Sequence, residues 1–269
     1  MRVGHKYVPE DSGPTARDAA PADFVATVGL RTFASREEFL AGASAGQGAE
    51  ILAGLRALLR RDRPVLAVAA GSGQVEAQLR VEGYDVVASD FAPELLDEAR
   101  RLVPELRTLQ LDVLRPAHDG RYDDVVAIAL DYALDDAELA TFLDTVRGVL
   151  LPGGRLILAH TYRDTAATRL IDRVLLPLWA RPRLAGRRRS EAPWVRKEHG
   201  FRRSERELVA AAAAKGFVLG RRIPYGWGLE LIRIGVDVRA PRLYRAVERV
   251  SRRLGRFNYG TLLELTLRS

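Results

Sequence analysis

Short apolar runs alternate with amphipathic segments through the middle of the chain. The apolar runs cover residues 65–70, 86–88, 109–111, 125–130 and 156–159. Helical patterns separate most of them, over Gln74–Arg80, Pro93–Arg101 and Asp136–Leu150. A strand that reads as a continuous apolar run is buried on both faces, so this alternation predicts an α/β fold with a parallel sheet covered by helices on both sides.

Capping signals add further elements on either side of this region. Ser35-Arg-Glu-Glu38 is a capping box that predicts a helix start, and a second helix is expected over Gly48–Arg61. The Pro152-Gly-Gly turn is expected to end one helix and begin the strand at Leu156. A second capping box at Ser204 predicts a helix that stops at Gly216, followed by strands over Phe217–Ile223 and Thr261–Leu267.

The remaining segments are interpreted as an arm and insertions around one domain. Residues 1–22 lack periodicity and are expected to form a flexible arm, which leaves 23–269 as a single domain. Further helices are expected near Ala166–Ala180 and Pro241–Leu254. The helices of 23–62, together with 164–200 and 226–258, are expected to form a lid over the ligand and to choose the substrate.

Composition narrows the function classes. The chain of 269 residues has no cysteine, which excludes disulfides, zinc–thiolate sites, iron–sulfur clusters and cysteine nucleophiles. The net charge of +7 divides into −8 over residues 1–160 and +15 over 161–269. The basic part is open to four interpretations: a solvated arginine-rich surface, an acidic substrate, an anionic membrane surface or nucleic acid. No apolar signal segment is evident at the N-terminus, so a cytoplasmic location is expected.

Candidate chemistry gathers at the ends of the predicted strands. In an open parallel sheet, ligands bind beyond the carboxyl ends of the strands. Gly71 and Gly73 follow the first strand, Asp90 ends the second in VVASD, and Asp112 ends the third in LQLD. An acid at the Asp90 position can accept from both ribose hydroxyls of an adenosine cofactor, and one at Asp112 from an adenine amino group. Taken singly, the glycines could be a tight turn and each acid a helix cap or a solvated loop residue.

Other nucleotide and catalytic motifs do not fit this turn. A dinucleotide fingerprint requires a third glycine where the chain has Glu76, and a P-loop requires a Gly-Lys-Ser/Thr sequence that is absent. A nucleophile elbow requires glycines two residues either side of the serine, whereas Ser72 has Ala70 and Gln74 there. No pair among the four histidines has metal-ligand spacing, so no metal is expected.

The stretches VLAVAAGSG, VVASDFAPELLDEAR, LQLDVL, YDDVVAIALDYALDD and LLPGGRLILAH resemble the class I S-adenosylmethionine-dependent methyltransferases. The resemblance is good over 64–160 and loose over 200–223. It implies a doubly wound, Rossmann-like sheet of seven strands, the last antiparallel and inserted beside the fifth. It also implies S-adenosyl-L-methionine as cofactor and S-adenosyl-L-homocysteine as product. The implied cofactor-binding residues are Ala69, Gly71, Ser72, Gly73, Asp90, Phe91, Asp112, Val113 and Leu130.

The chain departs from the family pattern at two positions of the turn. The pattern reads acid-x-Gly-x-Gly-x-Gly, but Ala67 stands in place of the acid and Ala69 in place of the first glycine. The first change removes a charge-assisted contact to the cofactor's amino group, and the second adds a methyl group where backbone and ligand come close. Weaker or rearranged cofactor binding is therefore expected.

Methyl transfer needs alignment of donor and acceptor, and a base only where the acceptor must lose a proton. The candidate catalytic residues follow the fourth and fifth strands: Asp131, Tyr132, His160 and Tyr162, with His160 preferred because imidazole titrates near neutrality. A helix cap or a packing role is the alternative for His160.

Three functions remain open at this point. The first is methylation of an O, N or C atom of a small molecule, expected to be a large, partly apolar or anionic natural product or lipid-linked compound. The second is a non-methylating reaction, such as cyclisation or rearrangement, on the same fold. The third is nucleic-acid methylation or non-enzymatic binding of nucleic acid. A small-molecule substrate is the preferred partner, with nucleic acid disfavoured and membrane-surface contact and a homodimer left open.

Overall fold

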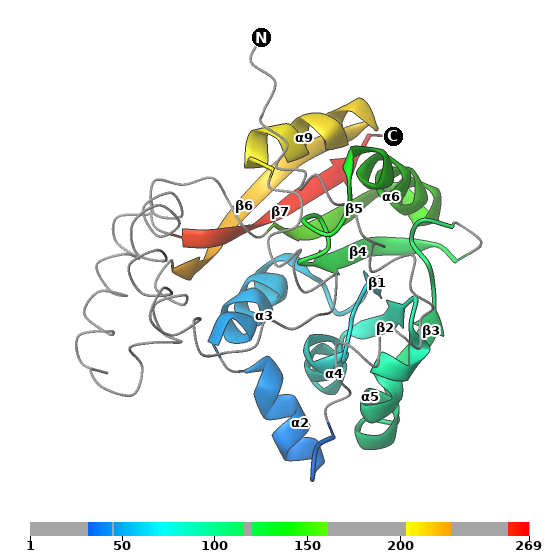
Figure 1. Ribbon diagram of the computed structural model, residues 1–269, viewed down its shortest axis with the longest axis vertical. Coiled ribbons are helices and arrows are strands. Elements are labelled where there is room, and N and C mark those ends of the chain that lie inside the picture. The colour runs from blue at the N-terminus through cyan, green and yellow to red at the C-terminus, as the bar shows by residue number, and fades with distance from the viewer. Residues whose placement is uncertain (1–31, 45, 116–119, 161–202, 228–257, 269) are drawn as a thin grey trace, which may run out of the picture.

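The computed structural model describes residues 32–44, 46–115, 120–160, 203–227 and 258–268. Within them lies one seven-stranded sheet in the order β3-β2-β1-β4-β5-β7-β6 (Figure 1). Its strands are β1 (Pro64–Val68), β2 (Asp85–Asp90), β3 (Arg107–Gln110), β4 (Tyr122–Ile128), β5 (Leu150–His160), β6 (Phe217–Trp227) and β7 (Asn258–Leu267).

The pairing of the strands matches the predicted topology. Strands β1 to β5 are parallel wherever they pair, and β7 runs antiparallel to both β5 and β6. The last strand therefore lies beside the fifth, as the resemblance implied. Because the order reverses between β1 and β4, this is the point at which a doubly wound sheet opens a crevice for a ligand.

Helices cover both faces of the sheet. The described helices are α2 (Arg36–Ala43), α3 (Gly46–Leu58), α4 (Gln74–Val81), the 3-10 turn η1 (Pro93–Leu96), α5 (Asp97–Leu102), α6 (Asp136–Val149) and α9 (Glu205–Ala214). Residues of α3, α4 and α5 share one buried cluster with alternate sheet residues such as Val65 and Ile157. Residues of α6 and α9 share the other cluster with Leu66 and Leu158. This period-2 division explains why the strands read as continuous apolar runs.

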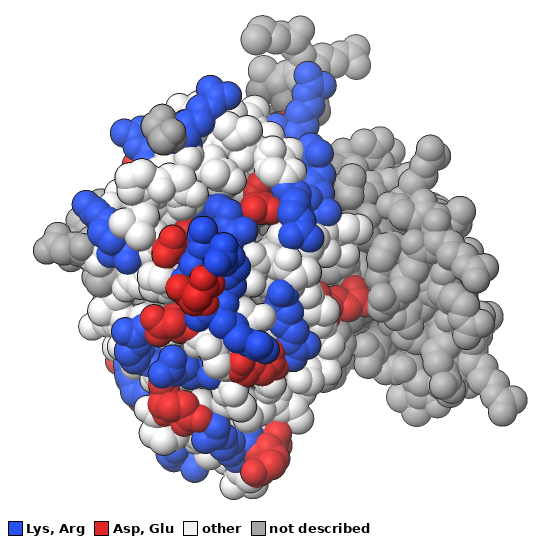
Figure 2. Space-filling model, turned by 180° about the vertical axis from the view of Figure 1, so that it is seen from behind, with Lys and Arg blue, Asp and Glu red and all other residues white. Residues whose placement is uncertain are grey.

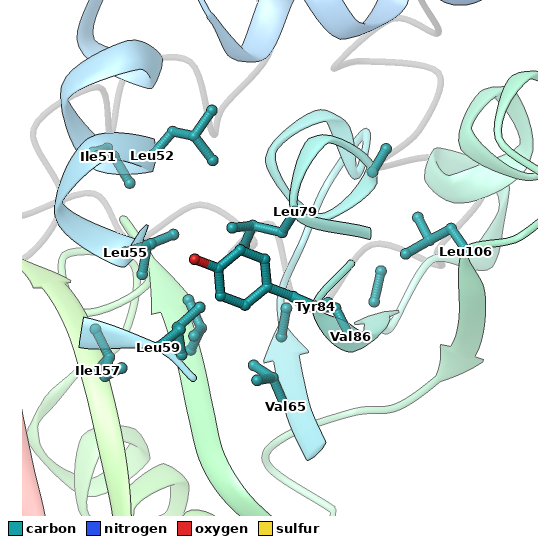
Figure 3. Close-up of a cluster of buried hydrophobic side chains, with 14 of the residues drawn as sticks. Ile51, Leu52, Leu55, Leu59, Val65, Leu79, Tyr84, Val86, Leu106 and Ile157 are labelled. Carbon is teal, nitrogen blue, oxygen red and sulfur yellow. The ribbon is translucent and has the colours of Figure 1, made fainter. Parts of the chain in front are cut away.

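A tyrosine ring fills the centre of the first cluster. Figure 3 shows the Tyr84 ring lying among Leu55 and Leu59, which come from α3 and the residue just after it, and Leu79 of α4. The helix α3 approaches the sheet closely, since a Cβ at Gly54 would meet the side chain of Leu262 on β7. The predicted N-terminal helix is thus a packed layer of the core on this face.

Both predicted capping boxes begin helices. The Ser35 hydroxyl accepts from the Glu38 N–H at 3.2 Å, and α2 begins at the next residue. The Ser204 hydroxyl accepts from the Glu207 N–H, also at 3.2 Å. In turn, the Ser204 N–H donates to the Glu207 carboxylate at 2.8 Å. A side-chain oxygen at the N-cap satisfies an N–H group that the first helical turn leaves unpaired.

Several predicted boundaries differ from the structure. The helix expected over Gly48–Arg61 starts at Gly46 and ends at Leu58. Strand β5 begins at Leu150 and not at Leu156, so Pro152-Gly-Gly is a bulge inside the strand, where pairing with β4 jumps from Tyr122↔Leu150 to Asp124↔Arg155. Strands β6 and β7 are longer than predicted and take in residues 226, 227 and 258 of the expected insertion.

The arm 1–22, the helices near 166–180 and 241–254, and most of the segments 164–200 and 226–258 lie outside the described residues. Tyr162 and three of the histidines, His5, His118 and His199, also lie outside them. None of the helices in the described part of the chain is long and apolar enough to cross a membrane.

Candidate functional site

The turn after β1 joins the ends of two neighbouring strands. The Gly71 N–H donates to Oδ2 of Asp90, at the end of β2, over 2.9 Å. The other oxygen of Asp90 accepts from the Ala92 N–H at 3.1 Å. The carboxylate, on a residue only 3% exposed, is therefore directed at the glycine turn. Burial raises its pKa, and hydrogen bonds from Ala92, Gly71 and Phe91 partly offset that effect.

The turn is built from alternating left-handed residues. Ala69, Gly71 and Gly73 have φ values of 51°, 57° and 70°. A Cβ added at Gly71 would meet no atom within 4 Å, whereas one at Gly73 would lie 3.0 Å from the side chain of Leu96. Gly73 is thus needed for packing against the segment after β2, and Gly71 leaves open space above the turn. Ser72 is half-buried between them.

The adenine side of the predicted site follows β2 and β3. Asp90 pairs with Gln110 in the sheet, so Asp112 lies just beyond the neighbouring strand end. Its Oδ1 accepts from the Leu114 N–H at 2.9 Å and so caps the turn after the strand. Its Oδ2 lies 3.6 Å from Arg115 Nε. Phe91 is half-buried, while Val113 is 8% exposed and packs into the core.

A buried histidine and a buried aspartate face each other at the ends of β4 and β5. His160 Nδ1 and Asp131 Oδ2 are 2.6 Å apart, and the two side chains are 0% and 1% exposed. Ile128 of β4 pairs with Ala159 of β5, which brings the residues after both strands together. Leu130 and Tyr132 flank Asp131 and are half-buried. The Asp131–His160 pair therefore lies at the same sheet edge as the glycine turn.

A methyltransferase domain family model matches residues 65–154, which span β1 to the start of β5 and include the turn, Asp90 and Asp131. Over these residues the chain is similar to a methyltransferase domain. Two curated proteins named demethylmenaquinone methyltransferase align with it. The Beutenbergia cavernae protein is 36% identical over 98 residues, covering 36% of this chain and 40% of that protein. The Thermus thermophilus protein is 37% identical over 108 residues, covering 38% and 48%. The chain spans less than half the length of either relative.

Solved methyltransferases have the same fold over most of the chain. Magnesium protoporphyrin IX methyltransferase from Synechocystis, with bound SAH, is 16% identical with a TM-score of 0.53 and covers 92% of this chain and 93% of its own. The glycopeptide N-methyltransferase MtfA, complexed with SAM, is 16% identical with a TM-score of 0.54 and covers 83% and 95%. At these identities the likeness extends to the fold of the methyltransferase domain and no further.

The structure places three polar residues at the site that the sequence did not single out. Glu76 of α4 is 3% exposed, and burial raises its pKa to about 7, with the nearby Asp90 charge adding to the effect. Arg203, 7% exposed, donates to the carbonyl oxygens of Asp131 at 2.8 Å and Leu134 at 2.7 Å. Gln47 of α3 bonds the hydroxyl of Tyr225. No sequence motif marks any of the three residues. Glu76 has the position of an ordinary acidic residue in the first turn of a helix, and Arg203 is one of many arginines in the chain.

Among the described residues, no group of three His, Cys, Asp or Glu side chains is placed to hold a metal ion.

Proposed function

We propose that the protein binds S-adenosylmethionine at the turn of residues 69–73 and transfers its methyl group to a small-molecule acceptor. The observation that carries the proposal is the hydrogen bond from the Gly71 N–H to the buried Asp90 carboxylate, which joins the turn and the second strand into one site. When bound, the cofactor supplies an electrophilic methyl group on a sulfonium centre.

The residues present fit an adenosyl ligand. The open space above Gly71 accommodates a close approach of the methionyl part. Asp90, buried and bonded by two backbone N–H groups, retains acceptor capacity for ribose hydroxyls. Phe91 and Val113 would flank the adenine ring, with Asp112 at its amino group and Leu130 closing the β4 side. Ala69, Ser72 and Gly73 complete the turn.

The acceptor is proposed to be large and partly apolar or anionic, as in natural-product or lipid-linked tailoring. Support comes from relatives that are named for demethylmenaquinone and from structural neighbours named for a porphyrin and a glycopeptide. The segments 23–62, 164–200 and 226–258 are proposed to enclose this acceptor. Asp131, Tyr132 and His160 are the proposed catalytic group.

A second candidate function rests on the turn itself. Ala67 and Ala69 remove an acid and a glycine that the family pattern carries, and Ala69 keeps the left-handed φ of 51° that glycine adopts without strain. A site altered in this way could hold the cofactor for a non-methylating reaction, such as a cyclisation or rearrangement.

Calorimetry with S-adenosylmethionine and S-adenosylhomocysteine tests the cofactor site. Replacing Asp90 with Ala should weaken binding of both about tenfold to a hundredfold, because hydrogen bonds to a charged group are worth about 1.5–3 kcal/mol each. Asp85→Ala is the matched control, since Asp85 begins the same strand at its opposite end, where it is half-buried and paired with Arg107. No heat with either ligand, or equal losses in the two variants, would refute the proposal.

Transfer of a labelled methyl group separates the two candidate functions. Incubation with methyl-labelled cofactor and candidate acceptors should move the label into product. Binding without any transfer, together with chemical change of an acceptor, would favour the non-methylating alternative.

A further inference from the structure

The glycine turn has a second buried carboxyl group near it, besides that of Asp90. Glu76 lies in the first turn of α4, three residues after Gly73, and like Asp90 it is 3% exposed. The negative charge of Asp90 acts on Glu76, so the two carboxyl groups are close enough to interact. The proposed function assigns the ribose hydroxyls to Asp90 and leaves Glu76 without a role.

Among the described residues, neither carboxyl group is paired with a lysine or an arginine. Asp90 accepts from the N–H groups of Gly71 and Ala92, and Glu76 accepts from its own backbone N–H. Burial disfavours the charged form of a carboxyl group and raises the pKa of Glu76 to about 7. An ionised Glu76 is therefore stabilised by a ligand that brings positive charge to the turn.

Other charged groups lie on the elements around α4. Those that pack most extensively against it are α2, α3 and β2. Their charged residues are Arg36, Glu37 and Glu38 on α2, Glu50 and Arg56 on α3, and Asp85 and Asp90 on β2. The two arginines are paired with Glu105 and Glu82, and Arg80 of α4 itself lies 3.5 Å from Asp85. Asp90 is the described charge that acts on Glu76.

The two forms of the proposed cofactor differ in charge. S-adenosylmethionine carries a sulfonium and an ammonium group against one carboxylate, whereas S-adenosylhomocysteine has a neutral thioether and no net charge. Methyl transfer leaves the C–S electron pair on sulfur and so removes the sulfonium charge. Attraction between that charge and a nearby carboxylate is therefore present before transfer and absent after it.

We propose that the ionised carboxylate of Glu76 makes the site select the cationic S-adenosylmethionine over the uncharged S-adenosylhomocysteine, so that methyl transfer itself weakens binding of the product. This inference rests on the proposed function and adds to it the basis on which the site distinguishes substrate from product. The role is electrostatic, so Glu76 is a positioning residue rather than a catalytic one. Loss of the proton as pH rises creates the attracting charge, so the preference grows with pH.

Calorimetry at about pH 6 and about pH 8 measures the selectivity as the ratio of the two dissociation constants. Glu76→Gln keeps the shape of the side chain and removes its charge. At about pH 8 the variant should bind S-adenosylmethionine about tenfold more weakly than the wild type, because a cation that lowers the pKa of a carboxyl group by about one unit binds its ionised form about tenfold more tightly. Binding of S-adenosylhomocysteine should stay within about twofold, and at about pH 6 the two proteins should differ by less than about twofold for either ligand.

Proton release measures the same coupling from the other side. A ligand that favours the ionised carboxylate expels its proton, because coupling between two bound species is reciprocal. Titrations at about pH 7 in buffers of different ionisation heat should show about 0.4 more protons released by the wild type than by Glu76→Gln on binding S-adenosylmethionine. With S-adenosylhomocysteine the two proteins should release equal numbers. The ammonium group of the ligand titrates as well, but equally in both proteins.

Glu76→Asp and Glu82→Gln are the matched controls. Glu76→Asp keeps the charge and should restore most of the preference that Glu76→Gln loses. Glu82→Gln removes a charge at the opposite end of α4, where Glu82 is paired with Arg56, and should leave both dissociation constants within about twofold of the wild type. Asp90→Ala should instead weaken both ligands alike, because the ribose is common to them.

The failures of the two proposals differ. No heat with either ligand in the wild type would refute the proposed function. Binding of both ligands with equal losses in Glu76→Gln, or with no difference in proton release between wild type and variant, would overturn only the role of Glu76.

Discussion

Two alanines just beyond the carboxyl ends of central strands have left-handed backbone conformations. Ala69 follows β1 with φ 51°, and Ala129 follows β4 with φ 56°. Such a conformation costs an L-residue roughly 1–2 kcal/mol, and strain of this kind concentrates at binding sites. The strands β1 and β4 are neighbours, so both strained residues lie at the point where the strand order reverses.

Replacing Ala69 with Gly should tighten binding of S-adenosylhomocysteine by about threefold to tenfold, because it removes a methyl group from the turn that approaches the ligand. Stability should change by less than about 1 kcal/mol, since relief of strain is offset by the greater freedom of glycine in the unfolded chain. Ala129→Gly relieves the same strain away from the turn and should leave the dissociation constant unchanged. Calorimetry and urea unfolding would check both. Equal tightening in the two variants would assign the effect to backbone freedom alone.

Glu76 should make stability depend on pH. Its folded pKa of about 7 lies above the ordinary glutamate pKa of 4.5, so the native state binds more protons than the unfolded state between those values. Its contribution to stability is full below about pH 4.5 and is lost as pH rises through about 7. One pKa unit corresponds to about 1.4 kcal/mol, so Glu76→Gln should be more stable than wild type at about pH 8 by on the order of 3 kcal/mol and similar at about pH 4.5.

Glu82, at the C-terminal end of the same helix, is the control of opposite sign. Its pKa is lowered, chiefly by the hydrogen bond from Arg56, so its contribution is present above its unfolded pKa and lost as pH falls. Glu82→Gln should therefore lower stability at neutral pH and not in acid. Urea unfolding across this pH range would measure both variants, and a flat difference for Glu76→Gln would contradict the assignment.

At the residue scale, the position of a polar side chain could be predicted from the sequence where that residue directly follows a strand. Asp90 and the glycine turn could be assigned because parallel strands deliver their carboxyl ends to one edge. Asp131 and His160 were identified singly, but their pairing depends on the register of β4 against β5, which periodicity does not encode. The burial of Glu76 and Arg203 depends on tertiary packing, and neither residue stands in a pattern that signals it.

At the scale of elements, a glycine on β7 leaves room for the bulky Tyr225 side chain of the adjacent strand β6. Gly260 of β7 pairs with Tyr225 of β6, whose side chain is 0% exposed. A Cβ at Gly260 would lie 2.6 Å from the Tyr225 hydroxyl oxygen and 2.7 Å from the His160 carbonyl oxygen. Gly260 therefore permits the contact through which β6 and β7 hold the end of β5.

Gly260→Ala should destabilise the protein by about 2–3 kcal/mol, since overpacking a buried site against backbone cannot be relieved by a rotamer change. Gly220→Ala on β6 is the control, because its added Cβ would meet the nearest atoms at 3.5 Å, an ordinary contact. Thermal and urea unfolding would compare the two. A similar loss in both variants would point to strand glycines in general rather than to Tyr225.

The elements themselves were predicted well where one signal dominated. Apolar runs located all five parallel strands, and capping boxes located two helix starts. The predicted start of β5 was wrong because Pro-Gly-Gly normally marks a turn between elements. A bulge that keeps the chain within the sheet can have the same local sequence. The extensions of β6 and β7 depend on each other's pairing and not on local pattern.

At the scale of the whole molecule, charge on the described surface is mixed rather than separated. Figure 2 shows basic and acidic side chains interspersed on the face it presents. Ion pairs among the described residues include Arg36 with Glu105, Arg60 with Asp62 and Arg107 with Asp85. On the face that Figure 2 presents, acidic side chains therefore interrupt the basic ones. Contact of the basic C-terminal part with a membrane surface stays a prediction, and so does a homodimer.

The sheet should have a gradient of stability from its centre to the β3 edge. Strands β1 and β4 are buried between both helix layers, while β3 has exposed residues at each end. Hydrogen exchange should therefore be at least about tenfold faster in β3 than in β1, because edge amides open without global unfolding. Adding S-adenosylhomocysteine should slow exchange near Asp112 more than in β6. Equal protection of β3 and β1 in the free protein would contradict this gradient.

The position of β7 between β5 and β6 has a consequence for synthesis. During translation β6 leaves the ribosome before the strand that must separate it from β5, so it has no strand to pair with until residues 258–267 follow. Over that interval Phe217 and Tyr225, both buried in the finished sheet, lack their partners on β7, and an unpaired strand edge readily joins another chain. A nascent chain halted between residues 227 and 258 should accordingly bind chaperones more strongly than one released after β7.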